Sequence, residues 1–165
     1  MAAQRIEHAF QVSALTVAHL DDLVDLEREC YTLPWSRAMF AGELSREEGV
    51  RLGAWLGGAL VGYLVVARYA DVWHVMNIAV APSTRRMGVA GLLLDELFER
   101  TVDDDRRGYT LEVRVSNSVA IALYGSYGFS AHGLRPGYYV DNREDAIVMW
   151  KPPLGTADDG WVPET

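Results

Sequence analysis

The sequence predicts an α+β protein with one central twisted sheet, and three observations support this prediction. The chain has 165 residues, about the length of one domain, and 50% of them are hydrophobic, which suffices for a single packed core. Runs with β-type alternation and stretches with helical periodicity follow one another along the chain. No internal repeat is apparent. We therefore expect a single domain over residues 1–151, followed by a flexible tail over residues 152–165 that is rich in Pro, Gly and Asp.

The N-terminal part of the chain is predicted to contain a short strand and two helices. Hydrophobic residues alternate over residues 10–14, which favours a strand, and recur at helical spacing over residues 17–31. Pro34 ends this first helix. Ser36 can cap a second helix, which Gly49 is expected to end.

Three strands and a helix are expected next. Residues 51–57 and 59–69 are rich in β-forming residues and meet at Gly57-Gly58, which suits a two-residue hairpin turn. Residues 72–80 continue the sheet. After a glycine turn, hydrophobic residues recur at intervals of three and four over residues 89–102, as in a helix that packs on a sheet.

The C-terminal part repeats this mixture of elements. Residues 109–115 are predicted to form a strand and residues 118–127 a short helix, and the segments 129–135 and 144–151 are predicted to be the final strands. These elements complete the expected sheet.

Composition and charge narrow the function classes. The net charge of -8 argues against a general nucleic-acid-binding surface and would favour basic partners, although such a charge equally serves to keep a protein dispersed. Cys30 is the single cysteine, which excludes an internal disulfide and a thiolate-rich zinc site. It is expected to pack at a helix end. The first ten residues lack a basic start and a long apolar segment, so we expect a cytoplasmic protein without a membrane role.

The histidines give no indication of a metal site. They show no metal-ligand spacing with one another or with Cys30, so we expect them to be structural or exposed and expect no metal cofactor. The four are His8, His19, His74 and His132.

Residues 85–90 read RRMGVA and lie between a predicted strand and a predicted helix. Backbone amides that converge at a helix N-terminus bind anions, and flanking arginines add charge for a pyrophosphate. The spacing is that of neither the nucleoside triphosphate loop nor the dinucleotide turn. A different phosphorylated cofactor is therefore implied.

The pattern R-x-x-G-x-A after a strand resembles the acetyl-coenzyme A signature of the GCN5-related N-acetyltransferases (GNAT). Residues 111–129, which begin with LEVRVSN and end with GF, resemble the L-E-V-R-x-S-N-x-x-A-x-x-L-Y-x-x-x-G-F block of the RimI branch, which acetylates protein N-terminal amines. With the weaker match at residues 34–36, the resemblance spans about residues 10–151. It implies a mixed, largely antiparallel twisted sheet, flanked by helices and splayed between its fourth and fifth strands.

The resemblance also implies which residues hold acetyl-coenzyme A. Backbone groups of the fourth strand would lie along the pantetheine arm and help to polarise the thioester carbonyl. Asn117 would contact the cofactor, and its type and position fit a helix N-cap equally well. The implied strand residues are Ile78, Ala79 and Val80, and the implied turn residues are Arg85, Arg86, Met87, Gly88, Val89, Ala90 and Gly91.

Glu112 is the candidate general base, acting directly or through water. It lies on a strand with one buried face, and partial burial would raise its pKa from about 4.3 toward the range useful near neutrality. The alternative is that Glu112 pairs with Arg114, two residues along the same strand. The match to the family favours catalysis.

Tyr124 is the candidate general acid. A phenol that titrates near 10 keeps its proton at pH 7 and can release it to a leaving thiolate. In isolation such a tyrosine is more often a packed helix aromatic with a solvated hydroxyl. The matches at Leu123 and at Gly128-Phe129 favour the catalytic role.

The acceptor is expected to be an α-amine. Such an amine titrates near 7.7–8.0 and a lysine near 10.4, a gap of about 3.4 kcal/mol that favours an N-terminus for a mild carboxylate base. Enclosure could lower a lysine pKa as well. By family position Trp35, Tyr138 and Tyr139 are candidates for the peptide groove, although such aromatics are as often core or rim residues. Val140 replaces the proline usual in the branch.

The resemblance thus implies an alanine-type N-terminal acetyltransferase of the RimI branch. Its amine substrate would attack acetyl-coenzyme A directly in a ternary complex, and the implied target is a basic, small-subunit ribosomal protein. One alternative is transfer to internal lysines or small amines. Another is a non-catalytic acyl-coenzyme A-binding subunit that docks on another protein, such as a tRNA-modification complex, against which the presence of Glu112 and Tyr124 argues.

Overall fold

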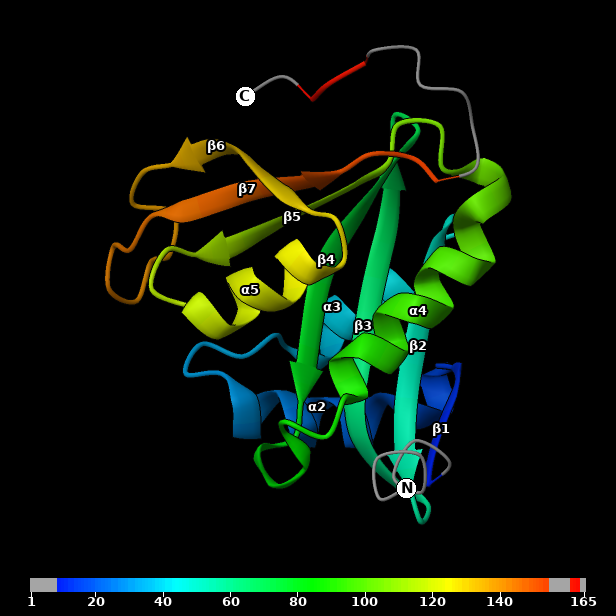
Figure 1. Cartoon of the computed structure of the whole chain (residues 1–165). Helices are drawn as coiled ribbons and strands as arrows, with labels where there is room; N and C mark the ends of the chain where they lie inside the picture. Colours follow the sequence, from blue (N-terminus) through cyan, green and yellow to red (C-terminus); the bar gives the residue numbers. More distant parts are fainter. Residues whose placement is uncertain (1–8, 155–160, 164–165) are drawn as a thin grey trace. The chain divides into compact units, whose positions relative to one another are not determined.

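The structure, a computed structural model, describes residues 9–154 and 161–163 (Figure 1). Within these residues the chain divides into two compact units. The first unit contains the chain up to Ala67 together with Met76–Arg100, and the second unit contains Arg68–Val75 and the chain from Thr101 onward. Strands β3 and β4 pass from one unit to the other. The prediction of a single domain over residues 1–151 stays a prediction.

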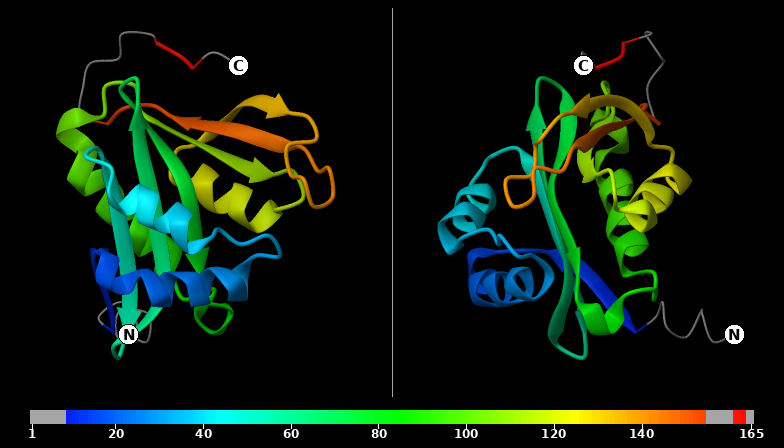
Figure 2. Two further views of the ribbon diagram at one scale, coloured as in Figure 1. Left: turned by 180° about the vertical axis from the view of Figure 1, so that it is seen from behind. Right: turned by 90° about the vertical axis from the view of Figure 1, so that its left-hand side faces the viewer.

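The first unit is a layered arrangement of strands and helices. Helices α2 and α3 cover one face of its strands, and α4 covers the opposite face (Figure 2). Its elements are β1 (Phe10–Ala14), η1 (Val17–His19), α2 (Leu20–Cys30), α3 (Arg37–Leu44), β2 (Gly49–Leu56), most of β3 (Ala59–Tyr69), the end of β4 (Val72–Val80), η2 (Pro82–Thr84) and nearly all of α4 (Val89–Thr101).

The two N-terminal helices form where periodicity and capping predict them. Leu20, Leu23 and Leu26 give α2 its buried face. The Ser36 hydroxyl accepts a bond from the Met39 amide at 3.2 Å, so the predicted cap of α3 is confirmed. The predicted end at Gly49 is wrong. Helix α3 ends at Leu44 because the Ser45 hydroxyl, 2.6 Å from the Ala41 carbonyl oxygen, satisfies a terminal carbonyl, and Gly49 begins β2.

The predicted hairpin at Gly57-Gly58 is confirmed. Both glycines have positive φ angles, 56° and 85°, as a two-residue turn between antiparallel strands requires. Strands β2 and β3 pair antiparallel from Leu56 opposite Ala59 onward, and β1 pairs antiparallel with β2. In the first unit the strand order is therefore β1-β2-β3-β4.

The second unit continues this order with β4-β5-β7-β6. Strand β7 pairs antiparallel with both β5 and β6, whereas β4 and β5 pair parallel through Trp73 with Tyr109 and His74 with Thr110. These pairs of β4 with β5 lie at the beginnings of both strands, as the predicted splay between the fourth and fifth strands requires. The further elements of the unit are η3 (Val102–Asp104), β5 (Tyr109–Arg114), α5 (Ser118–Ser126), β6 (Ser130–Arg135) and β7 (Ala146–Lys151).

The seven strands thus form the mixed, largely antiparallel sheet of the predicted α+β fold. None of the helices in the described residues has the length and hydropathy of a transmembrane span.

The predicted flexible tail falls partly on residues 155–160 and 164–165, which lie outside the described residues. Trp161 is described, and its ring lies 6.1 Å from that of Trp150 on β7. The Arg107 guanidinium carbon lies 5.0 Å from the same ring. These contacts give Trp161, which the sequence pattern leaves unexplained, an aromatic and a cationic neighbour.

Candidate functional site

The basic glycine turn of the first unit has the backbone conformation of an anion-binding turn. Arg86 and Gly88 have φ angles of 65° and 82°, and α4 begins at the next residue, Val89. The Arg85 Nε donates to the Val80 carbonyl oxygen at 3.1 Å, which ties the turn to the end of β4.

The surroundings of Gly88 fit the predicted diphosphate. Apart from Gly88 itself and its chain neighbours Met87 and Val89, no heavy atom of the described chain lies within 4 Å of where a Gly88 Cβ would stand, so a ligand can approach this backbone closely. The first amide groups of α4 lack acceptors within the helix and suit an anion. The turn therefore carries the features that binding a phosphorylated donor needs.

Side chains from the C-terminal end of α2 reach the predicted pantetheine-binding segment of β4. The Tyr31 hydroxyl donates to the Ile78 carbonyl oxygen, and the Cys30 thiol donates to the Val80 carbonyl oxygen at 3.5 Å. Burial raises the pKa of the Cys30 thiol, against the lowering effect of Arg85. The half-buried thiol is therefore held protonated, as expected of a packing residue rather than an acetyl carrier.

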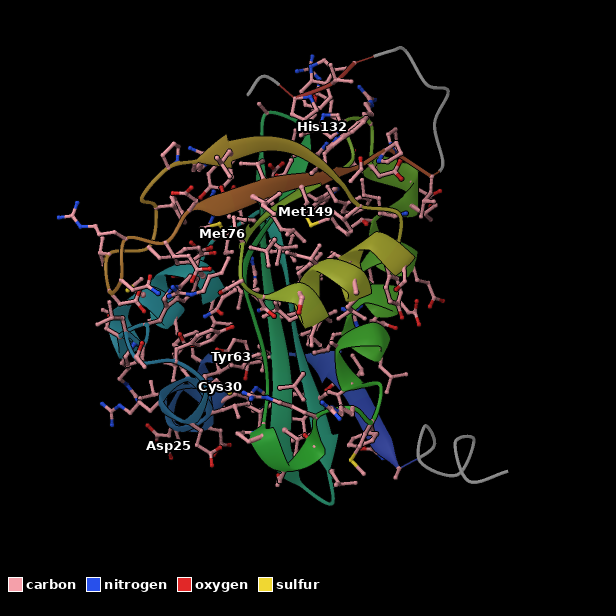
Figure 3. The ribbon with its side chains drawn as sticks, turned by 60° about the vertical axis from the view of Figure 1, so that its left-hand side comes forward. Asp25, Cys30, Tyr63, Met76, His132 and Met149 are labelled. Atoms are coloured by element: carbon pink, nitrogen blue, oxygen red, sulfur yellow. The ribbon has the colours of Figure 1, made fainter. Side chains whose placement is uncertain are left out.

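Trp35 lies between α2 and α3, where a buried carboxylate that sequence patterns did not single out fixes the backbone. Glu27 of α2 is 2% exposed, and its Oε1 accepts the Trp35 amide at 3.1 Å. Its Oε2 accepts the Asn77 amide group at 3.0 Å and the hydroxyl of Tyr63, which Figure 3 labels. The signal available in the sequence is an acidic residue one turn after Leu23, on the hydrophobic side of α2.

The Glu112 carboxylate, in the second unit, contacts a histidine and an arginine from two other strands. Its Oε2 lies 2.9 Å from His74 Nε2, and its Oε1 lies 3.4 Å from Arg135 Nε. Burial raises the pKa of Glu112, but the hydrogen bond from His74 and the charges of His74 and Arg135 outweigh it, so the pKa lies below its ordinary value. The expected raised pKa is therefore wrong. Strand alternation reveals burial but not partners on other strands.

His74 is a site residue that sequence patterns missed. Its Nδ1 lies 2.7 Å from Thr110 Oγ1, so both ring nitrogens have partners on β5. The parallel pairing of His74 with Thr110 brings these residues together. No local pattern in the sequence predicts that His74 pairs with Thr110, which lies 36 positions further along the chain.

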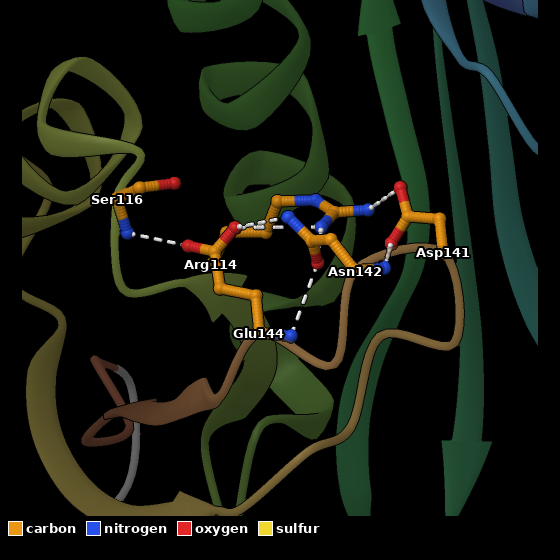
Figure 4. A network of polar contacts seen from close by, with 5 residues as sticks. All are labelled: Arg114, Ser116, Asp141, Asn142 and Glu144. Atoms are coloured by element: carbon orange, nitrogen blue, oxygen red, sulfur yellow. Dashed lines mark hydrogen bonds and ion pairs between the residues drawn. The ribbon is translucent and has the colours of Figure 1, made fainter.

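The alternative pairing of Glu112 with Arg114 is not the one observed. The Arg114 guanidinium lies 2.9 Å from the Asp141 carboxylate and 3.4 Å from the Glu144 carboxylate (Figure 4). Glu144 also accepts the Ser116 amide at 2.8 Å, and the hydrogen bonds with Ser116, with support from Asn142 and Arg114, lower the pKa of Glu144 to about 2. This network ties the β6–β7 loop to the end of β5.

The two candidate groove tyrosines of the second unit lie on that loop. Their rings are 5.1 Å apart and nearly perpendicular, and the Arg114 guanidinium carbon lies 3.9 Å from the Tyr139 ring centre. Tyr138 is 47% exposed, as a rim residue would be. Burial raises the pKa of Tyr139 to about 12 and raises that of Tyr138, and the Glu112 charge adds to both shifts. The structure thus brings the predicted base and these two aromatics together.

Tyr124 lies on α5 and is 7% exposed, with its ring 5.9 Å from that of Phe129. Burial, with a smaller contribution from Tyr139, raises the pKa of Tyr124 to about 12 rather than the expected 10. The hydroxyl therefore holds its proton more firmly than expected. It can donate a hydrogen bond to a developing thiolate and give up the proton late in the reaction.

Asn117 caps α5. Its Oδ1 accepts the Ala120 amide at 3.2 Å, so the predicted capping role is confirmed. Its contact with a cofactor stays a prediction.

In the described part of the chain, no group of three or more His, Cys, Asp or Glu side chains could hold a metal ion. The prediction that no metal is needed stays a prediction.

Several known proteins that this chain resembles are acetyltransferases. Residues 20–129 match the acetyltransferase (GNAT) family. A putative [ribosomal protein bS18]-alanine N-acetyltransferase of Bacillus subtilis is 33% identical over 84% of this chain and 93% of its own length. An N-alpha-acetyltransferase RimI of Mycobacterium tuberculosis is 37% identical over 84% of this chain and 89% of its own.

A solved structure extends the similarity to three dimensions. The crystal structure of the ribosomal-protein-S18-alanine N-acetyltransferase from Escherichia coli superposes with a TM-score of 0.83 at 30% identity, over 93% of this chain and 99% of the other.

Proposed function

We propose that this chain, which belongs to the acetyltransferase (GNAT) family, transfers the acetyl group of acetyl-coenzyme A to the N-terminal amine of a ribosomal protein. This chain matches 93% of the length of the Bacillus subtilis protein and 99% of the Escherichia coli structure, both named for alanine N-acetylation of this ribosomal protein. This coverage supports the same class of acceptor. An N-terminal alanine is therefore the acceptor to test first.

The observation that carries this proposal is the position of Glu112 beside Tyr138 and Tyr139. Arg135 joins them, because its Nε lies 3.4 Å from Glu112 Oε1 and its guanidinium carbon lies 6.0 Å from the centre of the Tyr138 ring, which in turn lies 5.1 Å from the Tyr139 ring. A base candidate and two peptide-groove candidates therefore share one small region. A peptide N-terminus held by these aromatics would present its amine to a carboxylate that is ionised at neutral pH.

The proposed chemistry is direct attack in a ternary complex. Glu112 takes a proton from the ammonium group, the neutral nitrogen bonds to the thioester carbonyl carbon, and the bond from that carbon to sulfur breaks. The Tyr124 hydroxyl hydrogen-bonds to the sulfur and supplies the proton that completes the thiol. When bound, acetyl-coenzyme A supplies the activated acetyl group. We assign its diphosphate to residues 85–91, its pantetheine arm to Ile78, Ala79 and Val80, and a further contact to Asn117.

The low pKa of Glu112 favours an α-amine over a lysine. A carboxylate with a lowered pKa is a weak base, so the proton affinity of the acceptor decides how often the amine is neutral. An α-amine loses its proton at a cost about 3.4 kcal/mol smaller than that of a lysine. The net charge of -8 is consistent with a basic protein acceptor.

The test is acetylation of matched peptides read by mass spectrometry. One peptide begins with Ala and contains an internal Lys, and its control has the same sequence with a formylated N-terminus. We expect acetylation of the first peptide at its α-amine and no turnover of the second. Acetylation of Lys in the blocked peptide at an equal rate would contradict the proposal.

A further inference from the structure

We propose that His74 is a positioning residue of the transfer reaction, which orients Glu112 and accepts from it the proton that the attacking ammonium group gives up. This inference rests on the proposed function, in which Glu112 is the base.

Strand register places the three groups in one line. Thr110 and Glu112 are two residues apart on β5, so their side chains point to the same face of the strand. His74 stands opposite Thr110 on the parallel strand β4 and reaches both side chains. Its Nδ1 is 2.7 Å from Thr110 Oγ1, and its Nε2 is 2.9 Å from Glu112 Oε2. The His74 side chain is 23% exposed and that of Glu112 is 13% exposed, so His74 has the better access to solvent.

The line of contacts suits one tautomer of His74. A neutral imidazole has one N–H donor and one acceptor nitrogen. While Glu112 is protonated, Nδ1–H donates to the Thr110 oxygen and the lone pair of Nε2 faces the Glu112 carboxyl group. A protonated Glu112 can then donate its proton to Nε2. In the resulting state the imidazolium donates from Nδ1 to Thr110 and from Nε2 to the Glu112 carboxylate, and the second of these bonds is charge-assisted.

The proton balance of the reaction requires such an acceptor. An ammonium group that becomes an amide loses two protons, and the leaving thiolate takes up only one. The first proton moves from nitrogen to Glu112 and then to His74 Nε2, before the carbon–nitrogen bond forms and the carbon–sulfur bond breaks. The second proton replaces the one that Tyr124 supplies to the sulfur. His74 finally releases the first proton to water.

Among the described groups that face Glu112, the imidazole is the one suited to receive this proton. His74 approaches from β4, Arg135 from β6, and Tyr138 and Tyr139 from the β6–β7 loop. An arginine stays protonated at any working pH, and a phenol keeps its proton at neutral pH. An imidazole ordinarily changes its charge between pH 5 and 8. Since the Arg135 guanidinium, 3.4 Å from Glu112 Oε1, favours the ionised form of Glu112, a proton that arrives on Glu112 is released readily.

The test compares His74→Gln and His74→Leu with the matched control His132→Gln. Gln retains an N–H donor for Glu112 but cannot take up a proton, whereas Leu removes both properties. His132, on β6, is a histidine whose ring packs on Trp150 at 5.2 Å (Figure 3). The kcat value and the KM values for the Ala peptide and acetyl-coenzyme A are measured from about pH 3.5 to 9, because the pKa of Glu112 lies below its ordinary value of 4.5, and folding is checked by thermal unfolding at each pH.

We expect both His74 variants to lose about tenfold to a hundredfold in kcat at pH 7, with both KM values within about twofold of wild type. In the Leu variant the acidic limb of the kcat profile should move to higher pH, because burial of Glu112 is then opposed by Arg135 alone among the two partners that lower its pKa. The control should keep the wild-type profile. A role limited to orienting Glu112 would leave the kcat of His74→Gln near the wild-type value, because Gln keeps an N–H donor, and this result would overturn the proton-accepting role.

The outcomes separate this inference from the proposed function. Wild-type kcat and an unmoved acidic limb in both His74 variants would overturn the inference while peptide acetylation stands. If the wild-type protein acetylates no peptide, the proposed function fails. The pairing of His74 with Glu112 is then tested by carbon-13 carboxyl titration of Glu112. The pKa of Glu112 should be higher in folded His74→Leu than in wild type. An equal pKa in the two proteins would overturn the inference.

Discussion

Replacing Glu27 by Gln should destabilise the protein and loosen the segment that carries Trp35. The carboxylate accepts three hydrogen bonds, from the Trp35 amide, the Asn77 amide group and the Tyr63 hydroxyl. Gln has nearly the same shape but presents an NH₂ group in place of one oxygen. Either the Trp35 amide then loses its acceptor, or the Tyr63 hydroxyl and the Asn77 amide group, which both donate to Oε2, lose their shared acceptor. A buried donor without an acceptor costs about 1–3 kcal/mol, and we expect a loss of unfolding free energy of about this size.

The assay is urea unfolding at pH 7, together with the KM for the Ala peptide. The matched control is Asp25→Asn, which removes one carboxylate charge from an exposed position of the same helix (Figure 3). We expect the control to unfold within about 0.5 kcal/mol of wild type. The KM for the peptide should rise in Glu27→Gln and stay unchanged in the control. A Glu27→Gln variant as stable as Asp25→Asn would refute the reasoning.

The pH dependence of this difference has a definite sign. Burial raises the pKa of Glu27, against the lowering effect of its bonds to Trp35 and Asn77. The folded state therefore binds the Glu27 proton more tightly than the unfolded state, and wild-type stability falls as the pH rises from the unfolded pKa through the folded pKa. Gln does not titrate. The stability gap between wild type and Glu27→Gln should thus narrow as the pH increases from about 4 toward neutrality, and a widening gap would contradict the raised pKa.

Three further variants test other parts of the site. Tyr124→Phe should lower kcat by at least about tenfold while the calorimetric affinity for coenzyme A stays within about twofold, because the lost hydroxyl acts on the leaving sulfur; a full kcat would remove the acid assignment. Arg85→Ala should raise the KM for acetyl-coenzyme A and leave the peptide KM unchanged, since Arg85 belongs to the turn assigned to the diphosphate; a change in peptide KM alone would contradict that assignment. Since the pKa of Glu144 is lowered to about 2, its contribution to stability is present above the ordinary value of 4.5 and is lost as the pH falls from there toward 2. The acid-unfolding curve of Glu144→Gln should accordingly be flatter than that of wild type between these limits, and parallel curves would refute the assignment.

Elements fixed by neighbouring residues could be predicted from the sequence. The helix after residue 17, the cap at Ser36 and the Gly57-Gly58 hairpin all depend on spacings within a few positions, and all three are confirmed. The end of α3 could not be predicted in the same way, because the Ser45 hydroxyl and Gly49 offered competing signals.

The electrostatics of the site could not be predicted, because its partners come from distant parts of the chain. The alternation of residues on β5 predicts one buried face, and this burial gave the expectation of a raised pKa for Glu112. The opposite shift arises from His74 and Arg135, which lie on strands β4 and β6. Glu27 was missed because a single polar residue on an apolar helix face only interrupts the hydrophobic pattern. Its three hydrogen-bond donors belong to other segments of the first unit, which the helical pattern does not reveal.

The state of Cys30 has a practical consequence for measuring this enzyme. Cys30 is the single cysteine of the chain, its thiol donates to the Val80 carbonyl oxygen, and burial raises its pKa. Disulfide reagents such as Ellman's react with the thiolate, so this protein should contribute only a slow, small background colour. Free coenzyme A, the product of each turnover, can therefore be followed continuously by the coloured aromatic thiolate that its thiol releases from the reagent, without first replacing the cysteine.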